Sequence, residues 1–189
     1  CVGFGFIELG TVTALPQPGN PTPRLFRFPA EQALVNRMGF NNHGSQALAD
    51  RLQVLADKGW SSPVPVGVNI GKSKVTPIDE APADYVTSTE RLRDVADYLV
   101  VNVSSPNTEK LRDLQGKDAL TALLQGVMDT RATLDRHLPV FLKIAPDLTR
   151  PELDDIAAAA RDTGVDAIIA TNTTISRDGL TSPHRVETG

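Results

Sequence analysis

The sequence contains little of what disulfide-bonded, metal-binding and nucleic-acid-binding proteins require. Its 189 residues include one cysteine, Cys1, which excludes an internal disulfide and a cysteine-based metal cluster. The three histidines show no short ligand spacing of the HExxH type, so no metal site is expected. A net charge of −4, without a run of basic residues, argues against a nucleic-acid partner. One tryptophan and two tyrosines are too few to indicate a platform for stacking bases.

Long apolar runs and common cofactor motifs are also absent. No apolar stretch is long enough for a transmembrane helix, and no signal or transit peptide is visible. The sequence lacks the GxGxxG, P-loop and GxSxG motifs of dinucleotide-binding, ATP-binding and hydrolase folds. The remaining composition, 40% hydrophobic and 22% charged, is ordinary for a globular protein. A small molecule is therefore the expected partner.

Short apolar runs alternate with helical patterns along most of the chain. Runs rich in valine and isoleucine, without polar alternation, are typical of buried parallel strands. They are Phe4–Leu9, Val66–Ile70, Asp97–Val103, Val140–Ile144 and Ala167–Ala170. Apolar residues at helical spacing predict helices over Gly44–Lys58, Asp84–Val95, Lys117–His137 and Thr149–Thr163. Thr149 and Glu152 form a capping-box pattern at the start of the last helix. This alternation predicts a parallel α/β sheet with right-handed crossovers.

Residues 11–40 interrupt the alternation. The segment is rich in proline and contains two candidate short strands, Arg24–Phe28 and Ala33–Arg37, separated by Pro29. Its apolar residues would serve no purpose in a disordered linker. We therefore expect an ordered insertion built around a β-hairpin.

The predicted strands share polar residues at their carboxyl ends. In parallel α/β folds the ligand site lies at these ends, in barrels and open sheets alike. A single polar terminus is more often a helix cap or turn residue, but repetition in five strands favours one polar pocket. The termini are Gly10-Thr11, Asn69, Asn102, Lys143 and Thr171-Asn172.

Several chemical roles are open for these termini. Asparagine both donates and accepts hydrogen bonds, so Asn69, Asn102 and Asn172 suit a planar heterocycle with alternating carbonyl and N–H edges. Lys143 could balance an anion, act as a Schiff-base nucleophile, or be a solvated lysine with a buried stem. Ser105 follows a strand end, where it is either a turn residue or a proton acceptor coupled to another group.

Motifs along the whole chain resemble those of dihydroorotate dehydrogenases, in the same order. They are GFIELGTVT at 5–13, NRMGFNN at 36–42, GVNIGK at 67–72, NVSSPNT at 102–108, LRDLQ at 111–115, KIAPDL at 143–148 and TNTT at 171–174. Cytosolic class 1 members carry a cysteine as the active-site base, whereas this chain has Ser105. It is therefore similar to class 2, the membrane-associated and quinone-reducing type.

The resemblance implies a fold, a reaction and a location. The fold is a (β/α)8 TIM barrel that holds FMN, with about strands 2 to 6 represented here together with the hairpin. Dihydroorotate is oxidised to orotate in pyrimidine (UMP) biosynthesis: the serine removes a proton from C5 while a hydride leaves C6 for the flavin. Electrons then pass to a quinone, at the surface of the inner (cytoplasmic or mitochondrial) membrane.

The resemblance also assigns residues, motif by motif. Ser105 would be the base, and Thr108 and Phe40 would shape its proton route. Thr11, Asn69, Asn102, Lys143 and Thr171 would contact FMN. The substrate would be surrounded by Asn36, Arg37, Met38, Gly39, Phe40, Asn102, Asn107, Asn172 and Thr173.

The resemblance stops short of several parts of the family pattern. The membrane-attaching segment, the first barrel strand and the glycine-rich loops for the FMN phosphate have no counterpart in these residues. We therefore expect residues 1–189 to form a partial FMN-binding barrel domain, with the hairpin insertion at 11–40, that is inactive by itself. Two alternatives are a Schiff-base aldolase or other phosphate-handling barrel that uses Lys143, and a non-catalytic barrel remnant that serves as a binding module.

Overall fold

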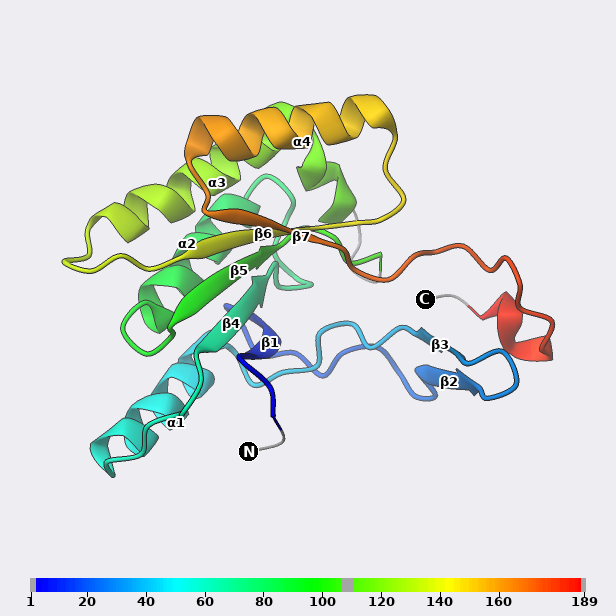
Figure 1. Ribbon diagram of the computed structural model, residues 1–189, viewed down its shortest axis with the longest axis horizontal. Helices are drawn as coiled ribbons and strands as arrows, with labels where there is room; N and C mark the ends of the chain where they lie inside the picture. Colours follow the sequence, from blue (N-terminus) through cyan, green and yellow to red (C-terminus); the bar gives the residue numbers. More distant parts are fainter. Residues whose placement is uncertain (1–2, 107–110, 188–189) are drawn as a thin grey trace.

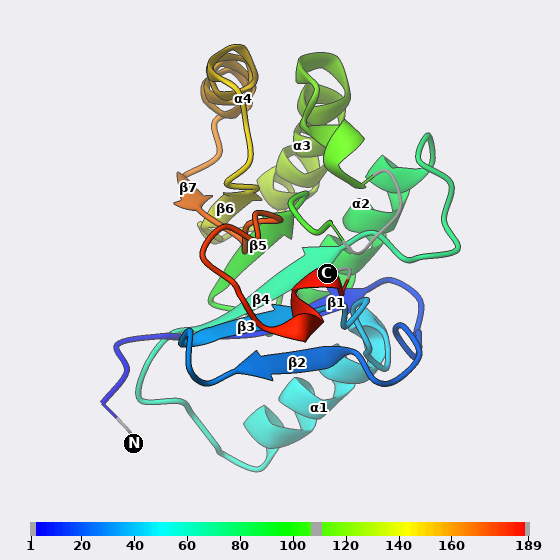
Figure 2. The same ribbon diagram turned by 90° about the vertical axis from the view of Figure 1, so that its right-hand side faces the viewer.

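A five-stranded parallel sheet, covered on one side by helices, forms the body of the molecule (Figure 1). The computed structural model describes residues 3–106 and 111–187. In spatial order the strands are β1 (Ile7–Thr13), β4 (Val66–Gly71), β5 (Tyr98–Asn102), β6 (Val140–Ile144) and β7 (Ala167–Ala170). The helices are α1 (Ser45–Asp57), α2 (Ala81–Leu92), α3 (Lys117–Ala132) and α4 (Arg150–Thr163), with short 3₁₀ turns η1 (Leu111–Gln115) and η2 (Pro183–Val186). Figure 2 shows the helices following the outer side of a curved sheet.

The structure confirms the predicted alternation, with one strand displaced. β4, β5, β6 and β7 agree with their predicted runs to within one residue at each end. The prediction of Phe4–Leu9 for the first strand was wrong at both ends, because β1 begins at Ile7 and continues to Thr13. The β-branched residues of Thr11-Val12-Thr13 suit an extended strand, and Val12 and Thr13 pair with Ile70 and Gly71 past a bulge after Gly10.

The helices are also where the sequence places them, with three changes at their ends. α2 ends at Leu92, short of the predicted Val95, whose backbone N–H turns back onto the Leu92 carbonyl. α2 begins at Ala81 rather than Asp84, because Pro82 stands in its first turn, where proline is favoured. α3 ends at Ala132, short of the predicted His137, as Thr133 and Leu134 turn back onto the last helical carbonyls. The capping box of Thr149 and Glu152 at the start of α4 is confirmed, and the backbone N–H of Thr149 donates to the Glu152 carboxylate over 2.7 Å.

The main hydrophobic core lies between the sheet and the helices. β5 contributes Leu99 and Val101 to it, and α3, which packs between α2 and α4, contributes Leu120 and Leu123, all fully buried. Burying side chains of this kind contributes roughly 1.5–3 kcal/mol each. The core fixes which face of each strand points to the helices. It therefore also fixes which residues point to the opposite, inner face.

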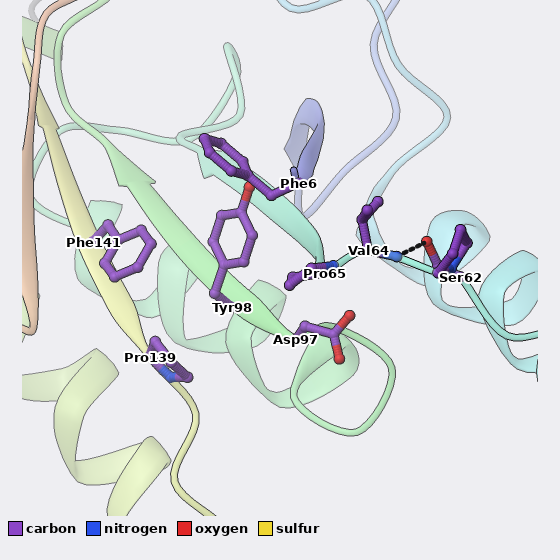
Figure 3. A pocket seen from close by; sticks show the side chains of 9 residues that line it. Phe6, Ser62, Val64, Pro65, Asp97, Tyr98, Pro139 and Phe141 are labelled. Carbon is purple, nitrogen blue, oxygen red and sulfur yellow. Dashed lines mark hydrogen bonds between the residues drawn. The ribbon is translucent and has the colours of Figure 1, made fainter. Parts of the chain in front are cut away.

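A row of aromatic rings covers the inner face near the amino ends of the strands (Figure 3). Tyr98 of β5 lies between Phe6 and Phe141, with ring centroids at 6.2 Å and 5.2 Å, and its hydroxyl donates to the carbonyl of Ile7 over 3.0 Å. To reach Ile7 on β1, the ring crosses β4 above Gly67. These rings line an open apolar cavity of about 670 Å³, which also includes Pro65.

The predicted hairpin is present as an antiparallel pair, β2 (Leu25–Phe28) and β3 (Ala33–Asn36). It lies beyond the carboxyl ends of the sheet strands, beside η2 (Figures 1 and 2). Phe26, Phe28 and Val35 form a separate small core, against which Leu180 packs. Glu31 accepts hydrogen bonds from the backbone of Thr181 and Ser182, so the hairpin is tied to the segment that follows β7.

The crossing of Tyr98 over Gly67 leads to a prediction about stability. A Cβ at Gly67 would lie 2.0 Å from atoms of the Tyr98 ring. We expect Gly67→Ala in the full natural chain to lower the free energy of unfolding by about 1–3 kcal/mol, as overpacking does. Urea-induced unfolding measures this quantity.

Gly5→Ala is the matched control, since no heavy atom lies within 4 Å of a Cβ at Gly5. Its effect should stay within about 0.5 kcal/mol. Equal stabilities for the two variants would contradict the described position of Tyr98.

Candidate active site

A layer of hydrogen-bonded polar side chains crosses the inner face at the carboxyl ends of the strands. Thr11 of β1 is at its centre. The Thr11 hydroxyl donates to Oδ1 of Asn69 on β4 over 2.6 Å and accepts from Nδ2 of Asn102 on β5 over 3.0 Å. Asn69 and Asn102 are 2% and 3% exposed. The structure therefore brings together three of the residues predicted to contact a cofactor.

The layer continues from β5 toward β7. Oδ1 of Asn102 accepts hydrogen bonds from both the backbone N–H and the hydroxyl of Ser104, at 3.1 Å and 2.7 Å. Nδ2 of Asn172, just after β7, donates to the Ser104 hydroxyl over 3.0 Å. On the helical side of the sheet, the hydroxyl of the buried Tyr85 of α2 donates to the backbone carbonyl of Asn102 over 2.6 Å. These bonds fix both the side chain and the backbone of Asn102.

Glu8 of β1 joins the layer to Lys143 of β6. Its Oε1 atom accepts a hydrogen bond from Nδ2 of Asn69 over 2.8 Å and lies 3.8 Å from Nζ of Lys143. Glu8 was not among the residues predicted for the site, because a glutamate in the middle of a strand gives no functional signal. The ion pair and the hydrogen bond restrain the side chains of Lys143 and Asn69 on either side of Glu8.

Ser105 lies just beyond the end of β5, beside this layer. It is 4% exposed and follows the fully buried Ser104. The Ser104 carbonyl accepts a hydrogen bond from Nε of Arg112 over 3.2 Å, and Arg112 forms an ion pair with Asp147 at 3.2 Å. The arginine therefore anchors the backbone next to Ser105. Asn107 and Thr108, which were predicted to bind substrate and to guide the proton, lie outside the described residues.

Asp147 joins the loop after β6 to the loop after β7. Its carboxylate accepts hydrogen bonds from the hydroxyl of Thr174 and the backbone N–H of Ile175. Partial burial raises the pKa of Asp147, but the bonds from Thr174, Ile175 and Arg112 outweigh it and hold the pKa below the ordinary aspartate value. The sequence did not single out Arg112 or Asp147 individually, although both belong to motifs of the family resemblance.

The segment Asn36–Phe40 connects the hairpin to the sheet. Phe40 packs against the main core, and the Gly39 carbonyl accepts a hydrogen bond from Gln17 over 2.8 Å. The Asn36 side chain accepts from the backbone N–H of Met38 over 3.3 Å. Arg37 forms a 2.7 Å ion pair with Glu187, which directly follows η2.

Thr171 and Thr173 flank Asn172 and are both exposed. The Thr171 hydroxyl donates to the Asn172 carbonyl over 2.9 Å, and the backbone N–H of Thr173 donates to Oδ1 of Asn172 over 2.8 Å. These local bonds orient the Asn172 side chain toward Ser104. The role of the two threonines in binding a ligand stays a prediction.

The donor set of the layer suits a planar, anionic heteroaromatic group. Asn69 and Asn102 each use one amide N–H within the layer and have a second, and the ammonium of Lys143 has N–H donors beyond its ion pair.

Within residues 3–106 and 111–187, no cluster of histidine, cysteine, aspartate and glutamate could hold a metal ion. In the same residues no helix is long and apolar enough to cross a bilayer. The apolar cavity of Figure 3 lies at the opposite end of the strands and is not part of this layer.

Comparison with known proteins places the chain in one family. The model of the dihydroorotate dehydrogenase family matches residues 1–188. The chain is 57% identical to dihydroorotate dehydrogenase (quinone) of Mycolicibacterium gilvum over 188 residues and 56% identical to the enzyme of the same name from Thermobifida fusca over 190 residues. These alignments cover 100% and 98% of this chain but 50% and 49% of the relatives. The chain thus spans about half the length of the curated relatives it matches.

A solved structure supports the same assignment. The ligand-free DHODH of Eimeria tenella superposes with a TM-score of 0.91 at 41% identity, and the match covers 99% of this chain and 57% of that chain. The predicted partial (β/α)8 barrel is thereby confirmed. By its sequence, its fold and the polar layer at the ends of its strands, this chain belongs to the dihydroorotate dehydrogenase family.

Proposed function

We propose that the protein containing these residues is a quinone-dependent dihydroorotate dehydrogenase. It would oxidise dihydroorotate to orotate with FMN and pass the electrons to a quinone, in the biosynthesis of pyrimidines. The observation that carries the proposal is the buried Ser105, 4% exposed, at the end of β5 beside the layer of Thr11, Asn69 and Asn102. The relatives at 56–57% identity bear the same functional name.

FMN would lie over the polar layer on the inner face of the sheet. Asn69, Asn102 and Lys143 would hold FMN with their remaining N–H donors, and Thr11 and Thr171 would also contact it. When bound, the flavin supplies a two-electron acceptor for a hydride. The ammonium of Lys143 would stabilise the negative charge that develops on the ring as the hydride arrives.

Ser105 would act as the base on the substrate. Its Oγ would accept the proton from C5 while its own hydroxyl proton leaves along a route shaped by Thr108 and Phe40. Burial suits this role, because a site closed to water strengthens each electrostatic interaction inside it. Asn172 and Thr173, together with Asn102, Asn107 and the segment Asn36–Phe40, would hold the amide edges and the carboxylate of the pyrimidine.

The electron acceptor would be a quinone, and the protein would work at a membrane surface. A quinone acceptor dissolves in the lipid phase, so the protein would work at the surface of an inner membrane, cytoplasmic or mitochondrial. Contact with the membrane would be made by a segment outside residues 1–189. The proposed reaction requires neither a nucleic acid nor a metal ion.

A Schiff-base aldolase that uses Lys143 is less consistent with the geometry. Such a nucleophile must present a free lone pair to a substrate carbonyl, whereas Nζ of Lys143 lies 3.8 Å from the carboxylate of Glu8 in an ion pair. Borohydride trapping of a substrate adduct on Lys143 would favour the aldolase.

The role of Ser105 is testable by substitution. We expect the Ser105→Ala variant of the full natural chain to retain FMN. Dihydroorotate should reduce its bound flavin about 10²–10⁴-fold more slowly than in the parent, because this is the usual contribution of a general base. Stopped-flow absorption of the flavin measures this step without the quinone.

Ser88→Ala is the matched control. Ser88 is fully buried in α2, and its hydroxyl has no hydrogen-bond partner within the described residues. The control should reduce flavin at the parental rate. A Ser105→Ala protein with an unchanged rate would refute the assignment of the base.

Residues 1–189 alone should bind no FMN tightly. β1 and β7 are the unpaired edges of the described sheet, and the inner face that would hold the ring is open beside them. After incubation with excess FMN and dialysis against FMN-free buffer, the purified 189-residue polypeptide should therefore be colourless, whereas the full natural chain should be yellow. A yellow, active preparation of residues 1–189 would contradict this expectation.

A further inference from the structure

Glu8 belongs to the polar layer but has no part in the reaction proposed above. It stands on β1, yet it reaches Lys143 on β6, and β4 and β5 lie between these two strands. Neighbouring strands are about 4.8 Å apart, so three spacings would separate the backbones by roughly 14 Å in a flat sheet. The 3.8 Å contact therefore depends on the curvature of the sheet toward its inner face.

The carboxylate links two side chains that would contact FMN. Oε1 of Glu8 accepts the Asn69 amide at 2.8 Å and approaches the Lys143 ammonium at 3.8 Å. Within the described residues, Lys143 forms its ion pair with Glu8. Glu8 thus restrains both side chains and offsets the positive charge of one of them.

The ion pair of Glu8 and Lys143 is partly exposed, with side-chain exposures of 27% and 23%. On the side of the amino ends lies the aromatic row, with Tyr98 crossing above Gly67. Burial and, secondarily, the charge of Glu8 raise the pKa of Tyr98, so its phenol stays neutral and adds no second negative charge beside the carboxylate. Water reaches the pair, so its two charges interact less strongly than they would in a closed interior.

We propose that Glu8 is a positioning residue that holds Lys143 and Asn69 toward the flavin and lowers the flavin midpoint potential. This inference rests on the proposed function. Reduction by a hydride adds negative charge to the ring, and the ammonium of Lys143 favours that charge. The carboxylate of Glu8 offsets part of this effect, which keeps the reduced flavin able to pass its electrons to an acceptor.

The test is a redox titration of the full natural chain with FMN bound. Glu8→Gln removes the negative charge and keeps an oxygen that can accept the Asn69 amide. We expect Glu8→Gln to make the midpoint potential of the flavin more positive by at least about 30 mV. In a two-electron couple this shift corresponds to a tenfold rise in the affinity for reduced FMN relative to oxidised FMN. Glu8→Asp keeps the charge but withdraws it from Lys143, so a smaller shift in the same direction is expected.

Glu90→Gln is the matched control, because Glu90 is exposed on α2, on the outer side of the sheet. Its potential should equal that of the parent. If the Glu8→Gln variant does not fold, the midpoint potential of the Glu8→Asp variant tests the role of Glu8 instead. Parental potentials in the folded Glu8 variants would overturn the role of Glu8 while leaving the proposed function intact. A parent protein without FMN or without dihydroorotate oxidation would instead overturn the proposed function.

Discussion

The parallel register of the sheet is the constraint on which the candidate site depends. It sets Gly10 opposite Asn69, Asn69 opposite Val100, and Asn102 opposite Lys143. Successive residues of a strand point to opposite faces, so a slip of one residue would turn a polar side chain from the inner face into the core. The hydrogen bonds of Thr11 to both asparagines exist only in the observed register.

The core and the inner face determine this register together. Leu99 and Val101 bury their side chains against the helices, which leaves Tyr98, Val100 and Asn102 to point inward from the same strand. On the inner face, the polar side chains gather at the carboxyl ends and the aromatic rings at the amino ends. Curvature then brings β1 close enough to β6 for Glu8 to meet Lys143. The chemistry of the layer is therefore a consequence of how the sheet packs and bends.

Much of this arrangement could be predicted from the sequence. Valine- and isoleucine-rich runs identified four strands closely, and the Thr149–Glu152 pair identified the start of α4. The polar strand ends indicated a common pocket, and the structure brings Thr11, Asn69 and Asn102 into contact there. The first strand was misplaced because Gly10 suggested an end, whereas Thr11, Val12 and Thr13 extend the strand past a bulge.

What the sequence could not reveal are contacts made across the sheet or between loops. Glu8 meets Lys143 only because intervening strands curve, and no spacing in the sequence encodes that curvature. Tyr98 reaches Ile7 only because Gly67 has no side chain. The pair of Arg112 and Asp147 joins loops that are 35 positions apart. Such contacts depend on tertiary geometry, which local patterns do not determine.

The most direct test of the account is a crystal structure of the full natural chain with FMN and orotate bound. We expect the flavin ring to lie over Asn69, Asn102 and Lys143. Oγ of Ser105 should be within about 3–3.5 Å of C5 of orotate, the distance of a reacting pair. A flavin bound away from the polar layer, or a Ser105 hydroxyl turned away from C5, would contradict the account.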